Sequence, residues 1–122
     1  MTAIVEQAHK LSLQVSIEGA AKFLQEILSR KLTAYIAGVK DAKTVTRWAN
    51  GEVTEIRVAH EQRLRTAYEI VQLLLQFDAP QTVRAWFIGM NPQLDDASPA
   101  ETIRGGQFKE AMGAARAFIA SG

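Results

Sequence analysis

The sequence contains no cysteine and only two histidines, His9 and His60, among its 122 residues. The absence of cysteine excludes disulfides, thiolate zinc sites and cysteine nucleophiles, and two histidines leave few ligands for any other metal site. No apolar run approaches the roughly 18 residues that a bilayer span needs. The first ten residues contain Glu6 and lack the apolar core of a secretory signal. We therefore expect a cytoplasmic protein with no membrane partner and no metal.

Recognisable catalytic groupings are also missing. Asp95 and Asp96 are adjacent carboxylates, but no base or positioned nucleophile accompanies them. Gly105-Gly106 is typical of a helix end and not of a phosphate-binding loop. We therefore expect a binding protein that is not an enzyme and needs no cofactor.

The composition is that of a folded domain, with 48% hydrophobic residues, 22% charged residues and a net charge of +1. It fits one domain, or two small modules that share a core. A net charge near zero argues against nucleic-acid binding, but the charge is unevenly distributed. Residues 30–65 carry eight Lys and Arg against four Asp and Glu, whereas residues 66–122 carry four against six. A basic charge confined to one segment is typical of a DNA-binding module.

Helical periodicity dominates the chain and predicts an all-α fold of six or seven helices. The expected helices cover residues 17–30, 33–37, 42–50, 58–77 and 80–88, then a short helix from Ser98 to Gly105 and a last helix over 107–120. The helix-start signals are the N-caps Ser16, Asp41 and Ser98, the last with Glu101 in a capping box, and the prolines Pro80 and Pro99. The stop signals are Gly38, Asn50-Gly51, Asn91-Pro92 and Gly105-Gly106. The stretch Leu11–Ile17 alternates like a strand but is isolated, so residues 1–15 are interpreted as an arm with no assigned secondary structure.

The expected long helix is apolar over too wide an arc for a one-sided surface helix. Its C-terminal half must be covered on most sides, either by the rest of the chain or by a second subunit. We therefore expect a homodimer, buried through residues 64–77 or through the last helix.

Residues 16–57 have the layout of a helix-turn-helix DNA-binding unit, with two short helices joined by a tight turn near Gly38. Val45 and Trp48, three positions apart, can anchor the third helix on the first two. Lys43 and Arg47, four positions apart, then lie together on its outward face. Arg47 can donate two hydrogen bonds to the edge of a guanine. The alternative is an ordinary solvated helix face. The candidate DNA-contacting residues are Lys40, Lys43, Thr44, Arg47 and Asn50.

Two sets of residues resemble known motifs, in the same order along the chain. The first resembles the third helix of Xre-type regulators and consists of Thr44, Val45, Arg47, Trp48 and Gly51. The second is similar to the C-terminal toxin-binding domain of MbcA/ParS/Xre antitoxins and consists of Trp86-Phe87, Asn91-Pro92-x-Leu94, Ser98-Pro99, Gly105-Gly106 and Ala115-Arg116. Together they cover roughly residues 17–122.

The resemblance implies an antitoxin that neutralises a RES-domain toxin, a class of toxin that degrades NAD⁺. In such antitoxins the C-terminal end reaches toward the active site of the toxin, and many also repress their own operon. The operator contacts would fall on Lys43, Thr44 and Arg47. The toxin contacts would fall on Arg116 and on Phe118, Ile119, Ala120, Ser121 and Gly122. Trp86, Asn91, Leu94 and Pro99 are interpreted as the structural core of the module.

The chain departs from the family pattern in two places. The turn over residues 38–44 is one residue longer than usual, which changes the expected docking angle of the third helix, and residues 1–15 have no counterpart. Two alternatives therefore stand beside the antitoxin that binds toxin and DNA. One is a transcriptional regulator whose C-terminal module, residues 58–122, dimerises or binds an unrelated partner. The other is an antitoxin whose N-terminal unit has lost DNA binding.

Overall fold

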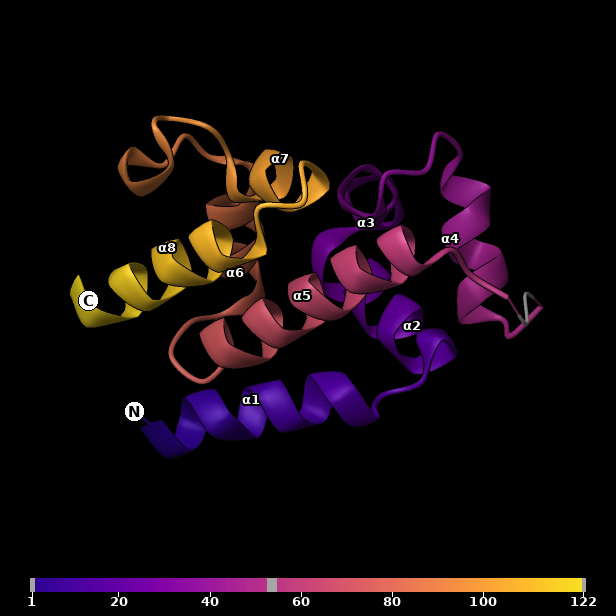
Figure 1. Ribbon diagram of the computed structural model, residues 1–122, viewed down its shortest axis with the longest axis horizontal. Helices are drawn as coiled ribbons and strands as arrows, with labels where there is room; N and C mark the ends of the chain where they lie inside the picture. Colours follow the sequence, from indigo (N-terminus) through magenta and orange to yellow (C-terminus); the bar gives the residue numbers. More distant parts are fainter. Residues whose placement is uncertain (1, 53–54, 122) are drawn as a thin grey trace.

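The structure is a computed structural model and describes residues 2–52 and 55–121. Over these residues the chain forms eight α-helices, one short 3-10 helix and no strand (Figure 1). The helices are α1 (Thr2–Gln14), α2 (Ile17–Leu28), α3 (Arg30–Ala37), α4 (Ala42–Ala49), α5 (Val58–Leu74), α6 (Pro80–Ile88), η1 (Pro92–Leu94), α7 (Pro99–Arg104) and α8 (Phe108–Ser121). The expected all-α class is confirmed.

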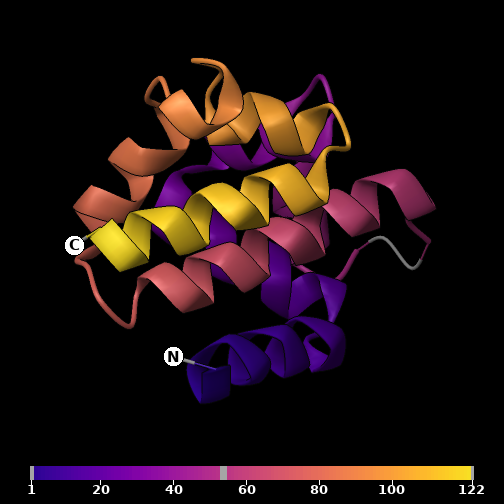
Figure 2. The ribbon, with the colours of Figure 1, turned by 60° about the vertical axis from the view of Figure 1, so that its left-hand side comes forward.

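Helix α5 lies at the centre of the molecule. Helix α1 packs along one side of it and α8 along another, so that the three helices lie side by side in Figures 1 and 2. Helices α2, α3 and α7 also contact α5, and Leu64, Ile70 and Leu74 are completely buried. The rest of the chain therefore provides the cover that the wide apolar arc of this helix requires.

The predicted N-terminal arm contains helix α1, and the stretch that alternates like a strand is helical over Leu11–Gln14. The face of α1 toward α5 follows a helical spacing: Ala8 and Ser12 are buried, and Leu11 and Val15 pack against the core. The guanidinium of Arg65 donates to the carbonyls of Ser12 and Val15 at 2.8 and 2.7 Å. These bonds satisfy carbonyls that the end of a helix leaves without partners.

Most predicted caps are present. The side chains of Ser16, Asp41 and Ser98 accept hydrogen bonds from backbone N–H groups two or three residues ahead. Pro80 and Pro99 are the first residues of α6 and α7.

Two helix boundaries differ from the prediction. The helix expected over residues 17–30 is α2 and ends at Leu28. Helix α3 begins at Arg30 and not at Thr33. Ser29 separates α2 from α3 with φ 96° and caps α3 by accepting from the N–H of Leu32 at 3.1 Å. The long helix ends at Leu74, because the next residues form tighter turns, with Phe77 N–H donating to the Leu74 carbonyl at 3.0 Å.

One continuous core joins both halves of the chain. The buried cluster includes residues of every α-helix from α2 to α8, and α2 and α3 pack against α6 and α7 respectively. Two arginines reinforce these contacts. Arg84 donates to the carbonyl of Ile27, 57 positions away, and Arg104 donates to the carbonyl of Tyr35, 69 positions away.

Candidate functional site

Helix α4 has one buried face and one exposed basic face. Val45 is 0% exposed and Trp48 is 3% exposed, and both belong to the core that α4 forms with α2 and α3. Lys43 and Arg47 are exposed on the other side of the helix. The predicted division of α4 into an anchoring face and an outward face is therefore confirmed.

The turn before α4 is closed by specific backbone contacts. Gly38 has φ 85°, and its N–H and that of Val39 both donate to the carbonyl of Ala34. A φ of this sign favours glycine at position 38, and the guanidinium of Arg63 lies next to it. Asp41 then starts α4 by accepting from the N–H of Lys43 at 2.9 Å. The longer turn is thus an ordered connection of four residues, 38–41.

The five candidate DNA-contacting residues do not form one cluster. Lys40 lies in the turn at the start of α4, whereas Asn50 lies at its end, about 12 Å away for a helix of eight residues. The amide of Asn50 donates to the carboxylate of Glu52 at 3.3 Å. Thr44 is half-buried. Lys43 and Arg47 are the pair that shares one exposed surface.

Sequence reasoning missed a third basic residue beside α4. The guanidinium of Arg30, at the first position of α3, donates to the hydroxyl of Thr46 at 3.2 Å. Arg30 was hidden because the prediction placed it at the end of the preceding helix. Its position at the start of α3 brings it next to the middle of α4.

The region after α4 is also pinned to the fold. The ring nitrogen Nδ1 of His60 lies 2.7 Å from the carbonyl of Ala37, and the imidazole lies 6.2 Å from the ring of Trp48. Gly51, with φ 71°, backs onto the carboxylate of Glu18 in α2. His60 is therefore a half-buried packing residue.

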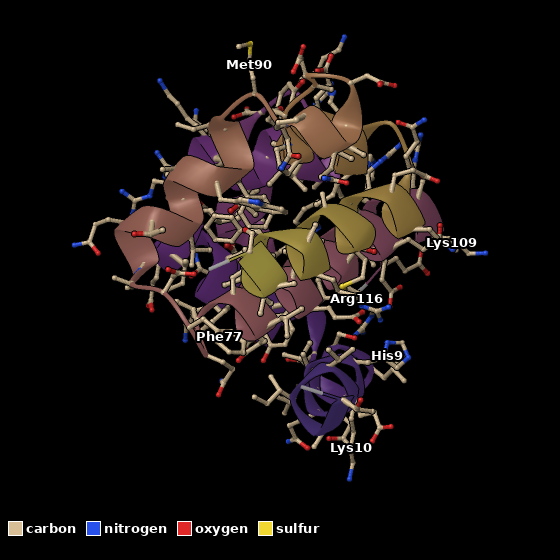
Figure 3. The ribbon with its side chains drawn as sticks, turned by 90° about the vertical axis from the view of Figure 1, so that its left-hand side faces the viewer. His9, Lys10, Phe77, Met90, Lys109 and Arg116 are labelled. Atoms are coloured by element: carbon tan, nitrogen blue, oxygen red, sulfur yellow. The ribbon has the colours of Figure 1, made fainter. Side chains whose placement is uncertain are left out.

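The candidate toxin-binding residues lie on two faces of α8. The ring of Phe118 packs 6.2 Å from that of Trp86, and Phe118 and Ile119 are both partly buried against the core. Arg116 is exposed on the face toward α1, where it borders grooves lined by Glu6 and His9 (Figure 3). Ala120 and Ser121 are exposed at the end of the helix, and Gly122 lies outside the described residues.

A groove of about 340 Å³ adjoins the end of α8. Trp86, Met90 and the segment 91–93 form one side, and Ala117, Phe118 and Ser121 form the other. Met90 is 81% exposed and projects from the molecule in Figure 3, and Ile88 on the same segment is 61% exposed. Exposed apolar side chains around a groove are typical of a protein-binding surface.

Two further properties concern the described part of the chain. Within residues 2–52 and 55–121, no group of three or more His, Asp or Glu side chains could hold a metal ion. None of the helices in those ranges is long and apolar enough to cross a membrane.

Comparison of the chain with protein-family models, with curated proteins and with solved structures gave no match.

Proposed function

We propose that this protein is an antitoxin that neutralises a RES-domain NAD-degrading toxin and represses its own operon. The proposal depends on the architecture that the resemblance implies, in which a helix-turn-helix unit precedes a toxin-binding module. The observation that carries it is the two-sided character of α4, with Val45 and Trp48 buried and Lys43 and Arg47 exposed. Two cations four positions apart on the exposed face of an anchored helix can reach the same major groove.

In the proposed DNA complex, α4 enters the major groove of the operator. Arg47 donates two hydrogen bonds to the edge of a guanine, and Lys43 contacts a neighbouring base or a phosphate. The anchoring of α4 by Trp48 fixes the backbone from which both side chains extend, so only the side chains themselves need to be ordered on binding. Lys40 and Asn50, at the two ends of α4, contact the sugar–phosphate backbone of the DNA beyond the contacts of Lys43 and Arg47.

In the proposed toxin complex, the end of α8 lies against the toxin near the entrance of its NAD⁺ site. Ala120 and Ser121 are small and exposed, so they can approach a cleft closely. The groove beside Trp86 and the exposed side chain of Met90 supply apolar surface for the body of the toxin. Neutralisation then results from occlusion of the NAD⁺ site and needs no chemistry from the antitoxin.

One observation favours the alternative of a DNA-binding regulator that is not an antitoxin. Phe118 already packs against Trp86 within the chain, so its apolar ring does not need a toxin to cover it. In this alternative the C-terminal module serves dimerisation or another partner.

Co-expression with the product of an adjacent RES-domain gene separates these functions. The antitoxin should co-purify with the toxin, keep cellular NAD⁺ at its normal level and restore growth. A regulator of the second kind would leave NAD⁺ depleted and would not co-purify. Binding to the promoter duplex in a gel-shift titration tests the DNA-binding half separately, and its absence would leave an antitoxin without repressor activity.

A further inference from the structure

A second basic surface lies beside the turn that precedes α4. It is a groove of about 550 Å³, and its lining includes Lys31 and Tyr35 of α3, Lys40 and Asp41 of the turn, and Arg104 at the end of α7. Three cations from three separate elements thus border one groove, accompanied by one carboxylate. The prediction from the sequence did not include Lys31 or Arg104 among the DNA contacts.

The arrangement of charges leaves these cations available to an anion. The carboxylate of Asp41 accepts from the N–H of Lys43 at 2.9 Å, so it is already used as the cap of α4. Across the described ranges, the ion pairs are His9 with Glu69 and Arg65 with Glu61, and none involves the groove. Lys31 and Lys40 are exposed to solvent.

Arg104 is held in place although its charge is not neutralised. Its guanidinium donates to the carbonyl of Tyr35 and lies 4.7 Å above the centre of the Tyr35 ring. Stacking on an aromatic face fixes the plane of a guanidinium while its other N–H groups remain free to donate. Arginine in this state is suited to a phosphate oxygen.

The groove adjoins the start of α4, because Asp41, the N-cap, and Ala42, the first residue of α4, are part of its lining. Lys40 is three positions before Lys43 in the sequence. A duplex that receives α4 in its major groove has a sugar–phosphate strand on each side of the helix. The strand on the side of the turn would pass along Lys31, Lys40 and Arg104.

We propose that Lys31, Lys40 and Arg104 hold the phosphate backbone of double-stranded DNA, so that α7 of the C-terminal half takes part in operator binding. This inference rests on the proposed insertion of α4 into the major groove. It adds a sequence-independent contact to the base readout by Arg47.

The experiment measures the affinity for a promoter duplex by fluorescence anisotropy at several salt concentrations between about 50 and 200 mM. Each lost phosphate contact lowers the slope of log K against log salt by about 0.9. Lys31→Gln and Arg104→Gln should each lower the slope by about that amount, and the double variant by about twice that amount. Lys10→Gln is the matched control, because Lys10 is exposed on α1 and points away from the rest of the molecule in Figure 3. It should leave the slope unchanged.

Two further measurements keep the outcomes distinct. Arg104→Lys retains the charge and should keep most of the slope, and a thermal melt of each variant reports any loss of folding. A wild-type slope that persists in Lys31→Gln and Arg104→Gln, while Arg47→Ala still weakens specific binding, would overturn this inference alone. Failure of the wild-type chain to bind the duplex would overturn the proposed DNA binding and the inference with it. A loss of toxin affinity in Lys31→Gln at unchanged DNA affinity would assign the groove to an acidic protein surface and overturn the inference.

Discussion

Arg47 is the single residue on which the proposed base readout depends most. It is exposed, and its neighbours Val45 and Trp48 hold the helix, so its truncation should not unfold the protein. We predict that Arg47→Ala weakens operator binding by about 1–3 kcal/mol, because a bidentate contact to a guanine is lost. A gel-shift titration measures the change, with Lys10→Ala as control. Equal affinity of Arg47→Ala and the wild type would contradict the assignment.

Ser29 combines two opposing effects on stability. Its hydroxyl caps α3, but its φ of 96° and ψ of 157° lie in a region that strains any residue with a side chain. Ser29→Ala keeps the strain and loses the cap, so we predict a loss of about 1 kcal/mol in the free energy of unfolding. Ser29→Gly removes the backbone strain, which stabilises the folded state by about 1–3 kcal/mol. The loss of the serine cap costs a few tenths of a kcal/mol, and the greater freedom of the unfolded chain costs about 0.4–1 kcal/mol.

Ser29→Gly should therefore be at least as stable as the wild type, and clearly more stable than Ser29→Ala. Urea denaturation of the three proteins checks the order. A Ser29→Gly protein that is less stable than Ser29→Ala would mean that the backbone at this position is not strained.

At the scale of the residue, the sequence predicted the role of those side chains whose role follows from local spacing. Gly38, Asp41, Val45 and Trp48 each act within one turn of their neighbours, so the pattern identifies them. Ser29 could not be predicted, because serine carries no signal for a positive φ. Arg65 and Arg63 contribute to the basic stretch of residues 30–65, yet Arg65 holds the end of α1 and Arg63 lies against Gly38. Charge counted along the chain therefore overstates the charge that faces a ligand.

At the scale of the elements, variants at the end of α8 can distinguish a loss of the proposed toxin contact from a loss of packing within the chain. Removal of residues 118–122 should abolish neutralisation but also uncover Trp86, so it lowers stability as well. Ala120→Arg places a large charged side chain at an exposed position of the same helix and leaves Phe118 in place. We predict that Ala120→Arg loses neutralisation at unchanged melting temperature, because the end of the helix no longer fits a cleft.

The measurement is the survival of cells that express the toxin, together with their NAD⁺ level. Operator binding by Ala120→Arg should remain at the wild-type level, which serves as the internal control. Survival with both the truncated chain and Ala120→Arg would show that the end of α8 does not contact the toxin.

Helix α1 shows what element-level prediction misses. A short alternation of apolar and polar residues in its second half resembles a strand as much as a helix. The helix is selected by tertiary contacts, namely the burial of Ala8 and Ser12 on α5 and the bonds from Arg65. These partners lie some 50 positions away in the sequence, beyond the reach of any local pattern.

At the scale of the whole molecule, the prediction concerns the association of two copies of the chain. The chain covers residues 64–74 of α5 with its own helices, so of the surfaces predicted for a second copy Phe77 and the last helix remain accessible. On α8, Phe108 and Met112 are only partly buried and line a groove that faces α1. We retain the prediction of a homodimer and assign it to the last helix.

Light scattering at micromolar concentration should give twice the chain mass of 13.4 kDa. Met112→Lys should then return the protein to a monomer, because the charge would be buried in the interface, whereas Phe77→Ser should leave the dimer intact. A wild-type monomer would contradict the dimer, and a monomer from Phe77→Ser alone would move the interface to the end of the long helix.

The all-helical class and most helix positions could be predicted, because they follow from periodicity and capping. The packing of α3 on α7 and of α2 on α6 could not, since nothing in the sequence marks which distant segments meet. The basic groove was missed for this reason, because it needs Arg104 beside Tyr35.

The same long-range contacts have a consequence for how the protein is made. Helices α2 and α3 emerge from the ribosome before α5, α6 and α7, which cover them, and Arg104 must be synthesised before it can reach Tyr35. Residues 17–52 therefore cannot bury all of their apolar surface until α7 has been synthesised. Nascent chains that end before α7 leave part of the buried surface of α2 and α3 open to chaperones and proteases.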